Sequence, residues 1–257
     1  MLLLKVMDEW TKILDEGDSV NVIYTDFSKA FDTVPHGRLI SKLSGYGIRG
    51  KMLTWIGEFL KDRKQRVVVQ GEASSWEWVK SGVPQGSVLG PILFLIYIND
   101  ITEGIKSEAY LFADDMKLFS RVVDIHSSMV LQNDLDIVMR WTKKWLLSLN
   151  IGKCKVLAMG KGAGSFDYEV DIVSGRVRLE RSALERDLGV QVDSELTFQE
   201  HIWGKVKTAN KMVGLIRRNF GEAGAHSLML IYKAMVRPHL EYKVKLVEAL
   251  EKVQKRA

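Results

Sequence analysis

The stretch Y-L-F-A-D-D-M-K-L-F (110–119) constrains the fold most, because two adjacent aspartates interrupt an otherwise apolar pattern. Its two apolar arms, 110–112 and 116–119, predict a β-hairpin with the aspartates at its tip. Aspartate is common in turns, since its side chain can hydrogen-bond its own backbone, so a solvated turn is the simplest interpretation. A functional interpretation requires other polar groups that the fold brings to the same place.

Strand and helix patterns are mixed along the rest of the chain. Val20, Val22 and Tyr24 share one face of a predicted strand that leads to Asp26. The apolar run 88–98 predicts a buried helix after a loop rich in glycine and proline (81–91). The other expected elements are helices over 36–43, 52–60 and 129–146, a hairpin over 66–80 with a five-residue loop at 71–75, strands at 155–159, 168–173, 176–180 and 188–192, and helices beyond 198.

The charge of the chain is uneven. Its net charge is +5, but residues 200–257 hold 12 Lys or Arg against 5 Asp or Glu, a local net charge of +7. On a helix, Lys207, Lys211 and Arg218 fall within about 40° of one another, at 100° per residue. Such a stripe suits the phosphate backbone of a nucleic acid, although a row of charges is more often only the solvated face of a helix.

Composition excludes several other classes of protein. The longest apolar run, 88–98, is much shorter than the roughly 20 residues that a membrane-spanning helix needs. The apolar opening M-L-L-L-K-V-M is too short for a secretory signal, so the sequence predicts neither export nor a membrane partner. The single cysteine, Cys154, excludes an internal disulfide and a cysteine-rich zinc site.

Three carboxylates follow or interrupt predicted strands: Asp26, Asp114 and Asp115. If the two strand elements are neighbours in one sheet, these groups lie close together and repel one another unless a cation is bound. Oxygen ligands without a histidine or cysteine cluster favour Mg²⁺. Two such ions about 3.5–4 Å apart can clamp the attacking and leaving oxygens of a phosphoryl transfer.

Two further stretches suit such chemistry. Phe31, five residues after Asp26, can present an aromatic plate beside a bound substrate, although a core role is commoner for a lone phenylalanine. In the loop 81–91, Gly82 and Gly86 permit close backbone approach, and the Gln85 amide can contact a nucleotide or template. As an isolated motif, P-Q-G would equally be a tight turn.

Taken in order, D-F-S-K-A-F-D (26–32), S-G-V-P-Q-G-S-V-L-G-P (81–91) and F-A-D-D (112–115) resemble the reverse transcriptases of non-LTR, LINE-type retrotransposons, in particular the jockey and chicken-repeat type. The likeness continues through K-C-K-V-L (153–157), D-L-G-V-Q-V-D (187–193) and V-R-P-H-L-E-Y (236–242). It implies an α+β fold: a right-hand polymerase palm with a ferredoxin-like antiparallel sheet, partial fingers and a C-terminal helical thumb. The implied activity is RNA-directed DNA synthesis from dNTPs on an RNA template and a DNA primer, with two Mg²⁺ ions, or Mn²⁺ in their place.

The resemblance also assigns roles to residues around the metals. Asp26 and Asp114 become the principal metal ligands, Asp115 an auxiliary ligand, and Phe27 the donor of a backbone carbonyl. Lys153 resembles the lysine that protonates the leaving pyrophosphate, with Lys155 as the alternative, and an ordinary exposed lysine is an equally good interpretation of either residue.

The remaining roles concern substrate and nucleic acid. Phe31 becomes the steric gate against ribonucleotides, while Gln85 and Gly86 contact the incoming nucleotide. The segment 187–193 becomes the hairpin that grips the primer, and the basic helices with Lys207, Lys211 and Arg218 become the thumb.

The resemblance sets the expected domain organisation, with a palm and residual fingers over 1–195 and a basic, helical, thumb-like region over 196–257. We expect the remaining fingers and an endonuclease on a longer or separate polypeptide, and an internal deletion after R-P-H-L-E-Y. Such elements integrate into chromosomes, so the expected location is intracellular and nuclear. Two alternatives stay open: an inactive retrotransposon remnant that only binds nucleic acid, and an RNA-templated RNA polymerase, which would usually carry G-D-D.

Overall fold

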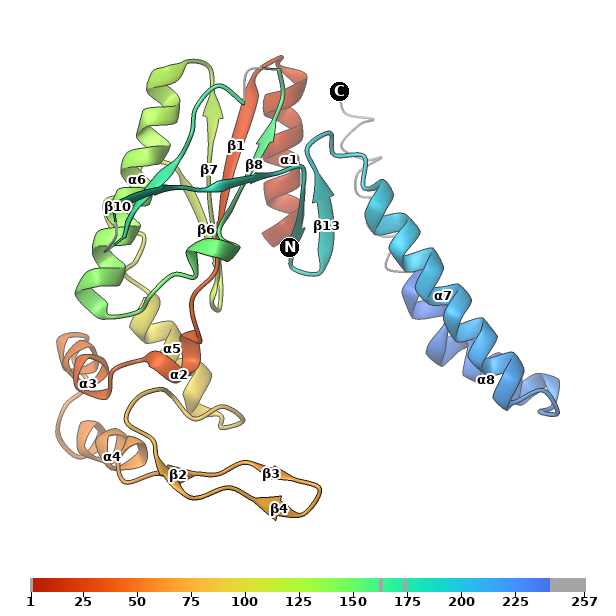
Figure 1. Ribbon diagram of the computed structural model, residues 1–257, viewed down its shortest axis with the longest axis horizontal. Helices are drawn as coiled ribbons and strands as arrows, with labels where there is room; N and C mark the ends of the chain where they lie inside the picture. Colours follow the sequence, from red (N-terminus) through yellow and green to blue (C-terminus); the bar gives the residue numbers. More distant parts are fainter. Residues whose placement is uncertain (1, 162–163, 173–174, 241–257) are drawn as a thin grey trace.

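The computed structural model describes residues 2–161, 164–172 and 175–240 and is built around one five-stranded sheet (Figure 1). The strand order is β11-β8-β1-β7-β6, with β11 parallel to β8 and the other pairs antiparallel. The strands are β1 (Ser19–Thr25), β6 (Glu108–Phe112), β7 (Asp115–Val122), β8 (Lys155–Met159) and β11 (Glu180–Ser182). The expected hairpin over 110–119 is confirmed as β6 and β7, and the expected α+β class is confirmed as well.

Both faces of the central strand β1 are covered, so β1 is buried almost throughout, including its polar residues Ser19, Asn21 and Thr25. Val20 and Val22 face one core cluster, which the helix α1 (Leu2–Asp15) closes with Trp10. Ile23 faces the second and larger cluster, which the helix α6 (Ile125–Trp145) closes with Leu131. Figure 1 shows α1 and α6 on opposite sides of the sheet.

Two features of these helices differ from expectation. No helix was expected in the opening segment, yet the structure places α1 there. The helix α6 begins at Ile125 rather than near 129, because Asp124 caps it: the Asp124 side chain accepts from the Ser127 backbone N–H at 2.8 Å.

Four helices lie beside the lower end of the sheet in Figure 1: α2 (Ala30–Thr33), α3 (His36–Gly45), α4 (Gly50–Leu60) and α5 (Leu89–Ile98). The helix α5 is the expected apolar helix, with Leu93, Phe94 and Tyr97 buried in the larger core cluster. Within the described residues, no helix is long and apolar enough to cross a lipid bilayer.

A long hairpin leaves this group of helices and extends outward, and we call it the 64–78 hairpin. It consists of β2 (Lys64–Gln65) paired with β5 (Glu77–Trp78), and β3 (Val68–Val69) paired with β4 (Glu72–Ala73). The expected five-residue loop is wrong. Gln70 and Gly71 both have positive φ angles, 51° and 90°, and form a two-residue turn of the primed type that hairpins favour.

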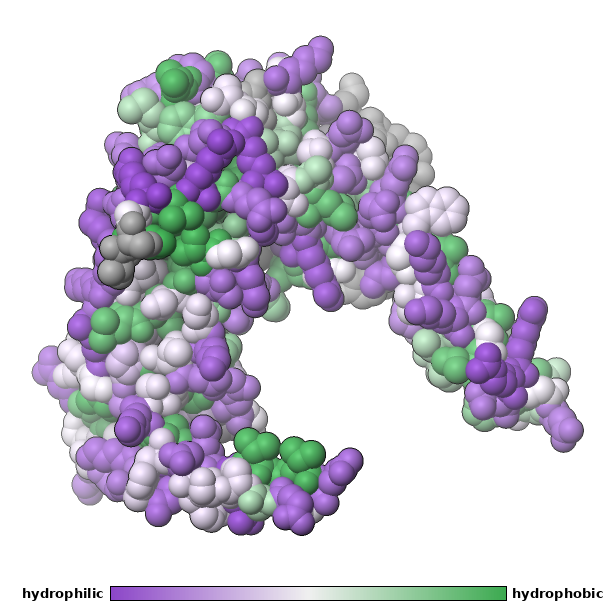
Figure 2. Space-filling view, viewed as in Figure 1, coloured by the Kyte–Doolittle hydropathy of each residue, from purple (hydrophilic) through white to green (hydrophobic). Residues whose placement is uncertain are grey.

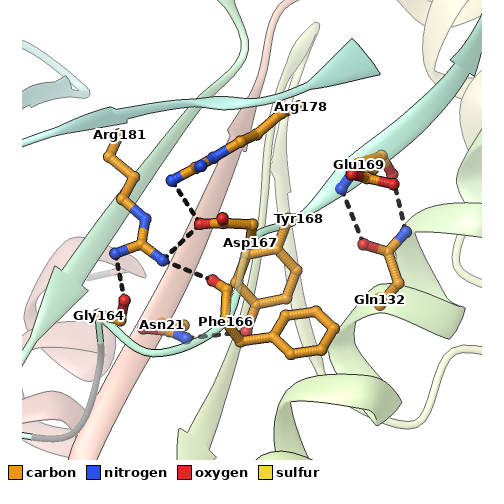
Figure 3. A network of polar contacts seen from close by, with 9 residues as sticks. All are labelled: Asn21, Gln132, Gly164, Phe166, Asp167, Tyr168, Glu169, Arg178 and Arg181. Atoms are coloured by element: carbon orange, nitrogen blue, oxygen red, sulfur yellow. Dashed lines mark hydrogen bonds and ion pairs between the residues drawn. The ribbon is translucent and has the colours of Figure 1, made fainter. Parts of the chain in front are cut away.

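The segment after β8 holds more strands than expected: β9 (Glu169–Ile172) pairs with β10 (Gly175–Arg178), and β12 (Leu184–Asp187) with β13 (Val190–Asp193). Sequence patterns missed β12 and treated β10 and β11 as one strand. Polar contacts attach the stretch around β9 to the main sheet and α6 (Figure 3). Asn21 Nδ2 donates to the Tyr168 hydroxyl at 2.8 Å, and Gln132 exchanges two hydrogen bonds with the Glu169 backbone.

The C-terminal part is helical, as expected, with α7 (Gln199–Asn219) packed against α8 (Ala225–Met235) around Ala209, Ile216 and Val236. Figure 2 shows a wide hollow between this helix pair and the 64–78 hairpin. The boundary expected at 195 falls between β13 and α7, and the division into two domains stays a prediction. The expected helical continuation over 243–257 and the inferred deletion there lie outside the described residues.

Candidate active site

The site forms where β1 and β7 end side by side. The antiparallel register pairs Thr25 with Met116, so Asp26 and Asp115 follow at opposing positions. Because side chains alternate along a strand, Asp26 belongs to the same face as Tyr24, and Asp115 to the same face as Lys117. All four residues line one pocket of about 200 Å³. The structure therefore brings together the two acidic groups that the sequence placed nearly 90 positions apart.

Backbone contacts hold Asp26 at the mouth of this pocket. Its carbonyl accepts from the Asn150 N–H at 2.7 Å, and Phe27 forms a β-bridge with Leu149. The Phe27 side chain is buried in the core. Lys153, the last residue of a short 3₁₀ helix (Ile151–Lys153), lies 3.4 Å from the Asp26 carboxylate and also lines the pocket.

Negative charge gathers around Asp115. Burial raises the pKa of its carboxyl group, and the neighbouring carboxylates of Asp114, Asp187 and Asp26 raise it further, against the opposing effect of Lys117. Ala113, with a φ of 55°, and Asp114 form the two-residue turn between β6 and β7. Among the described residues, the pocket lining contains Asp115 but not Asp114. The geometry thus pairs Asp26 with Asp115, whereas Asp114 was expected to have the larger role.

This donor set suits a hard cation. In the described part of the chain, no three Asp, Glu, His or Cys side chains gather as a metal site by themselves. Mg²⁺ is commonly held by only one or two carboxylates, with water and substrate phosphates completing its octahedron. Asp26 and Asp115, with mutual repulsion that a cation would relieve, fit that requirement.

A buried ion pair beneath the pocket was missed by sequence reasoning. Lys117 of β7 pairs with Asp187 of β12, and both side chains are only 6% exposed. The Tyr24 hydroxyl donates to the same carboxylate at 3.3 Å. Burial, followed by the Asp187 charge, raises the pKa of Tyr24 well above its usual value, so the hydroxyl stays a proton donor at neutral pH.

These contacts fix the hairpin of β12 and β13 against the main sheet. Its turn uses Leu188 and Gly189, both with positive φ, and residues 185–188 form one wall of the pocket. The sequence signal that could have found the pair is a lysine in an otherwise apolar strand, M-K-L-F, because a buried lysine needs a partner.

Lys155, the alternative to Lys153, has a different environment. It lies within β8 opposite Tyr24, and its ammonium group pairs with Glu180 of the edge strand β11. Among the described residues, the pocket lining includes Lys153 and does not include Lys155.

The residues expected to contact substrate, Phe31, Gln85 and Gly86, lie next to one another. Within the described part of the chain, they are not among the residues that line the pocket at Asp26 and Asp115. Phe31 is half-buried and stacks on Phe94, with 4.4 Å between ring centroids. Its carbonyl accepts from Val83 N–H at 2.7 Å, which ties the loop 81–91 to the segment after Asp26. The structure therefore shows the core packing that the sequence left open for Phe31.

The loop itself is shaped by close contacts. A Cβ at Gly82 would lie 2.7 Å from the Asp32 Cα, so this position requires glycine. Gly86 has a φ of 79° and open space around it, so the close approach expected there is not made within the protein. Gln85 is exposed and donates to the Asp32 carboxylate at 3.0 Å. Lys207, Lys211 and Arg218 are all exposed on α7, as the stripe requires.

Comparisons with known proteins agree on one family. The family described as "Reverse transcriptase (RNA-dependent DNA polymerase)" matches residues 6–195. The RNA-directed DNA polymerase from mobile element jockey of Drosophila funebris is 28% identical over 258 residues, which cover 95% of this chain and 28% of that protein. The probable RNA-directed DNA polymerase from transposon BS of Drosophila melanogaster is 28% identical over 207 residues, covering 73% and 22%.

The solved structures similar to this chain include a telomerase from Candida tropicalis in complex with a TWJ fragment of telomeric RNA. Its TM-score is 0.49 at 11% identity, with 100% of this chain and 43% of that chain covered. The chain spans about a quarter of the length of the jockey relatives it matches.

Proposed function

Because the chain belongs to the reverse transcriptase (RNA-dependent DNA polymerase) family, we propose that its pocket carries out RNA-directed DNA synthesis. The observation that carries the proposal is the juxtaposition of Asp26 and Asp115 on one face of the sheet, beside Lys153. The reaction joins the primer 3′ oxygen to the α-phosphorus of a dNTP and releases pyrophosphate. An RNA template and a primer are the partners that the family implies, and dNTPs are the proposed substrates.

Asp26 and Asp115 would hold Mg²⁺, or Mn²⁺, with Asp114 and the Phe27 carbonyl as further oxygen donors. Bound ions would neutralise the developing charge on the attacking and leaving oxygens, and a pair of ions suits the in-line displacement. The crowding of carboxylates at Asp115 supports this assignment, because it is unfavourable without a nearby positive charge.

Lys153 is the proposed acid for the leaving pyrophosphate. It is 66% exposed in its side chain and contacts Asp26 only at 3.4 Å, so it is free to turn toward a phosphate. Lys155 is held by Glu180 at the sheet edge, which makes it the weaker candidate.

The proposed recognition of the nucleotide sugar falls to Phe31. Its stacking on Phe94 gives the ring a fixed position, which a steric gate against a ribose hydroxyl needs. Gln85 and Gly86, on the loop that packs against this segment, are the proposed contacts to the incoming nucleotide. The stripe of Lys207, Lys211 and Arg218 is the proposed contact to duplex phosphates.

Primer extension on poly(rA) with an oligo(dT) primer tests the proposal. We expect incorporation of dTTP by the wild-type protein and a loss of at least about 100-fold for Asp26→Asn and Asp115→Asn, the scale on which electrostatic contributions to catalysis are lost. Asp171→Asn, an exposed carboxylate paired with Arg176, is the matched control and should retain activity. Lys153→Ala should slow extension more than Lys155→Ala.

Two results would contradict the proposal. Extension that survives in both aspartate variants would reject the site. Absence of extension by a folded protein that still binds primer and template would favour the alternative, an inactive remnant that binds nucleic acid. The nuclear location stays a prediction.

A further inference from the structure

The 64–78 hairpin exposes large apolar side chains that nothing in the described structure covers. Every residue from 64 to 78 is exposed, with Trp76 at 57% and Trp78 at 55%. Val67, Val68 and Val69 near its tip are exposed to a similar degree. Two strands without further support are only marginally stable in water. Indoles on such an element are better explained by a binding surface than by folding.

One face of this hairpin combines indoles with cations. Lys64 pairs directly with Trp78 across the strands, and its Nζ lies 4.1 Å from the indole centroid. Arg66 lies over Trp76 at 4.7 Å. The neighbouring pair, Gln65 and Glu77, points to the opposite face because side chains alternate along a strand. The carboxylate of β5 is thus kept away from the indole face.

The charge of the surrounding segment has the same sign. Residues 61–80 hold five Lys or Arg (61, 63, 64, 66 and 80) and three Asp or Glu (62, 72 and 77), a net charge of +2. An apolar protein partner would have to desolvate the two cations of the indole face without an opposite charge, which is costly. A second copy of the hairpin would bring cation against cation.

Single-stranded nucleic acid satisfies both kinds of group. Its unpaired bases stack on exposed aromatic rings, and its phosphates pair with lysine and arginine. In a duplex, by contrast, the bases are stacked on one another and offer no free face to an indole. The hairpin also borders the hollow in Figure 2, where apolar surface marks its free end, so a strand entering the hollow would pass along it.

We infer that the indole face of the 64–78 hairpin is a binding platform for single-stranded nucleic acid, with bases on Trp76 and Trp78 and phosphates on Lys64 and Arg66. The inference rests on the proposed function only in naming that strand as the unpaired template ahead of the pocket.

Binding of a fluorescein-labelled oligonucleotide to the full chain tests the inference. Fluorescence anisotropy is measured in EDTA with unstructured strands of about 20 nucleotides, oligo(dT) and oligo(rU), a length that covers the usual site sizes. The protein carries Asp26→Asn, so neither metal binding nor catalysis contributes. Trp76→Ala with Trp78→Ala should raise the Kd at least about tenfold, the loss expected for one to two stacked bases.

Matched variants separate stacking from folding. Trp76→Phe with Trp78→Phe keeps two rings and should bind within about threefold of the parent. Trp55→Ala removes an equally exposed indole, 56%, from α4 and should leave binding unchanged. Lys64→Gln with Arg66→Gln should reduce the slope of log K against log salt by about 1.4, the value for two phosphate contacts on a single strand.

A cross-linking measurement needs no variant of the hairpin. A strand that contains 5-bromodeoxyuridine should cross-link under ultraviolet light to Trp76 or Trp78. The inference is overturned if the double alanine variant binds within about twofold of the parent, or if cross-links map only outside the hairpin. It is also overturned if the alanine variant changes the oligomeric state and not the Kd.

The two proposals fail separately. Lost primer extension with oligonucleotide binding retained rejects the polymerase proposal alone, whereas extension with unchanged binding in the double alanine variant rejects the platform alone.

Discussion

The buried ion pair between Lys117 and Asp187 gives the sharpest test of how the pocket is built. Both side chains are 6% exposed, and the pair joins the β12–β13 hairpin to the main sheet. Removing one member of a buried pair leaves the other charge without compensation, which typically costs about 3–5 kcal/mol. Asp187→Asn should therefore lower the free energy of unfolding by about 3–5 kcal/mol.

The partner variant has a smaller cost. In Lys117→Met the Asp187 carboxylate keeps its hydrogen bond from the Tyr24 hydroxyl, at 3.3 Å, which partly satisfies the remaining charge. The double variant, Lys117→Met with Asp187→Asn, buries no unpaired charge, so it should be clearly more stable than Asp187→Asn alone, which leaves a lysine buried without its partner.

Urea unfolding followed by tryptophan fluorescence measures these differences, with Trp10 as a nearby reporter because Lys117 Nζ lies 5.6 Å from its ring. For a chain of this size, each 1 kcal/mol corresponds to about 2–4 °C in Tm, so Asp187→Asn should melt about 10 °C lower. A loss below about 1 kcal/mol, or a double variant as unstable as the sum of the singles, would refute the claim that the pair is buried and coupled.

Two further predictions concern other parts of the structure. Burial, followed by Lys205, lowers the pKa of His201, which accepts from the Gln191 N–H at 3.2 Å, so the unfolded chain takes up a proton first as pH falls. The free energy of unfolding should therefore decline below about pH 6.5, by at most about 1.4 kcal/mol per pH unit for this group. Urea titrations at several pH values measure this dependence, and His201→Asn should flatten it. The same dependence of the unfolding free energy on pH in His201→Asn would contradict the prediction. Gly82→Ala should cost at least about 3 kcal/mol, because its Cβ would lie 2.7 Å from the Asp32 backbone at a φ of 92°. Gly37→Ala, in the first turn of α3 with nothing within 4 Å, should be neutral or stabilising by up to about 1 kcal/mol, and equal effects of the two substitutions in thermal melts would reject the packing argument.

Local patterns were sufficient for those elements whose faces are either clearly buried or clearly exposed. The alternation over 20–24, the two apolar arms over 110–119 and the continuous apolar run of α5 each predicted their element, and the resemblance to the reverse transcriptase family is confirmed. The turn at Gln70 and Gly71 was misplaced because the stretch after it, E-A-S-S (72–75), also has the composition of a loop. Gly71 was the stronger sequence signal, because glycine readily adopts the positive φ that a two-residue hairpin turn requires.

Long-range contacts account for what the sequence could not show. Lys117 looks like an outward-facing residue of a strand, and only the arrival of Asp187, 70 positions later, makes its burial possible. The strand β12 is polar in sequence and exists because it pairs with β13 and lies against the pocket. The local sequence around Lys117 does not indicate β12, and the local sequence of β12 does not indicate Lys117.

Strand geometry, rather than composition, decides that Asp115 faces the pocket and that Asp114 lies in the turn. Phe112 pairs with Asp115, so the turn between β6 and β7 contains only two residues, Ala113 and Asp114. That turn length fixes which aspartate enters the strand, and the period of two then directs Asp115 to the face of Lys117 and Asp26. If the turn were one residue longer, Asp115 would lie within it and Met116 would pair with Phe112, which would direct Met116 and Leu118 away from the core that they now fill. The position of Asp115 is therefore set by the register of the sheet, and the position of Asp114 by the turn that fixes this register.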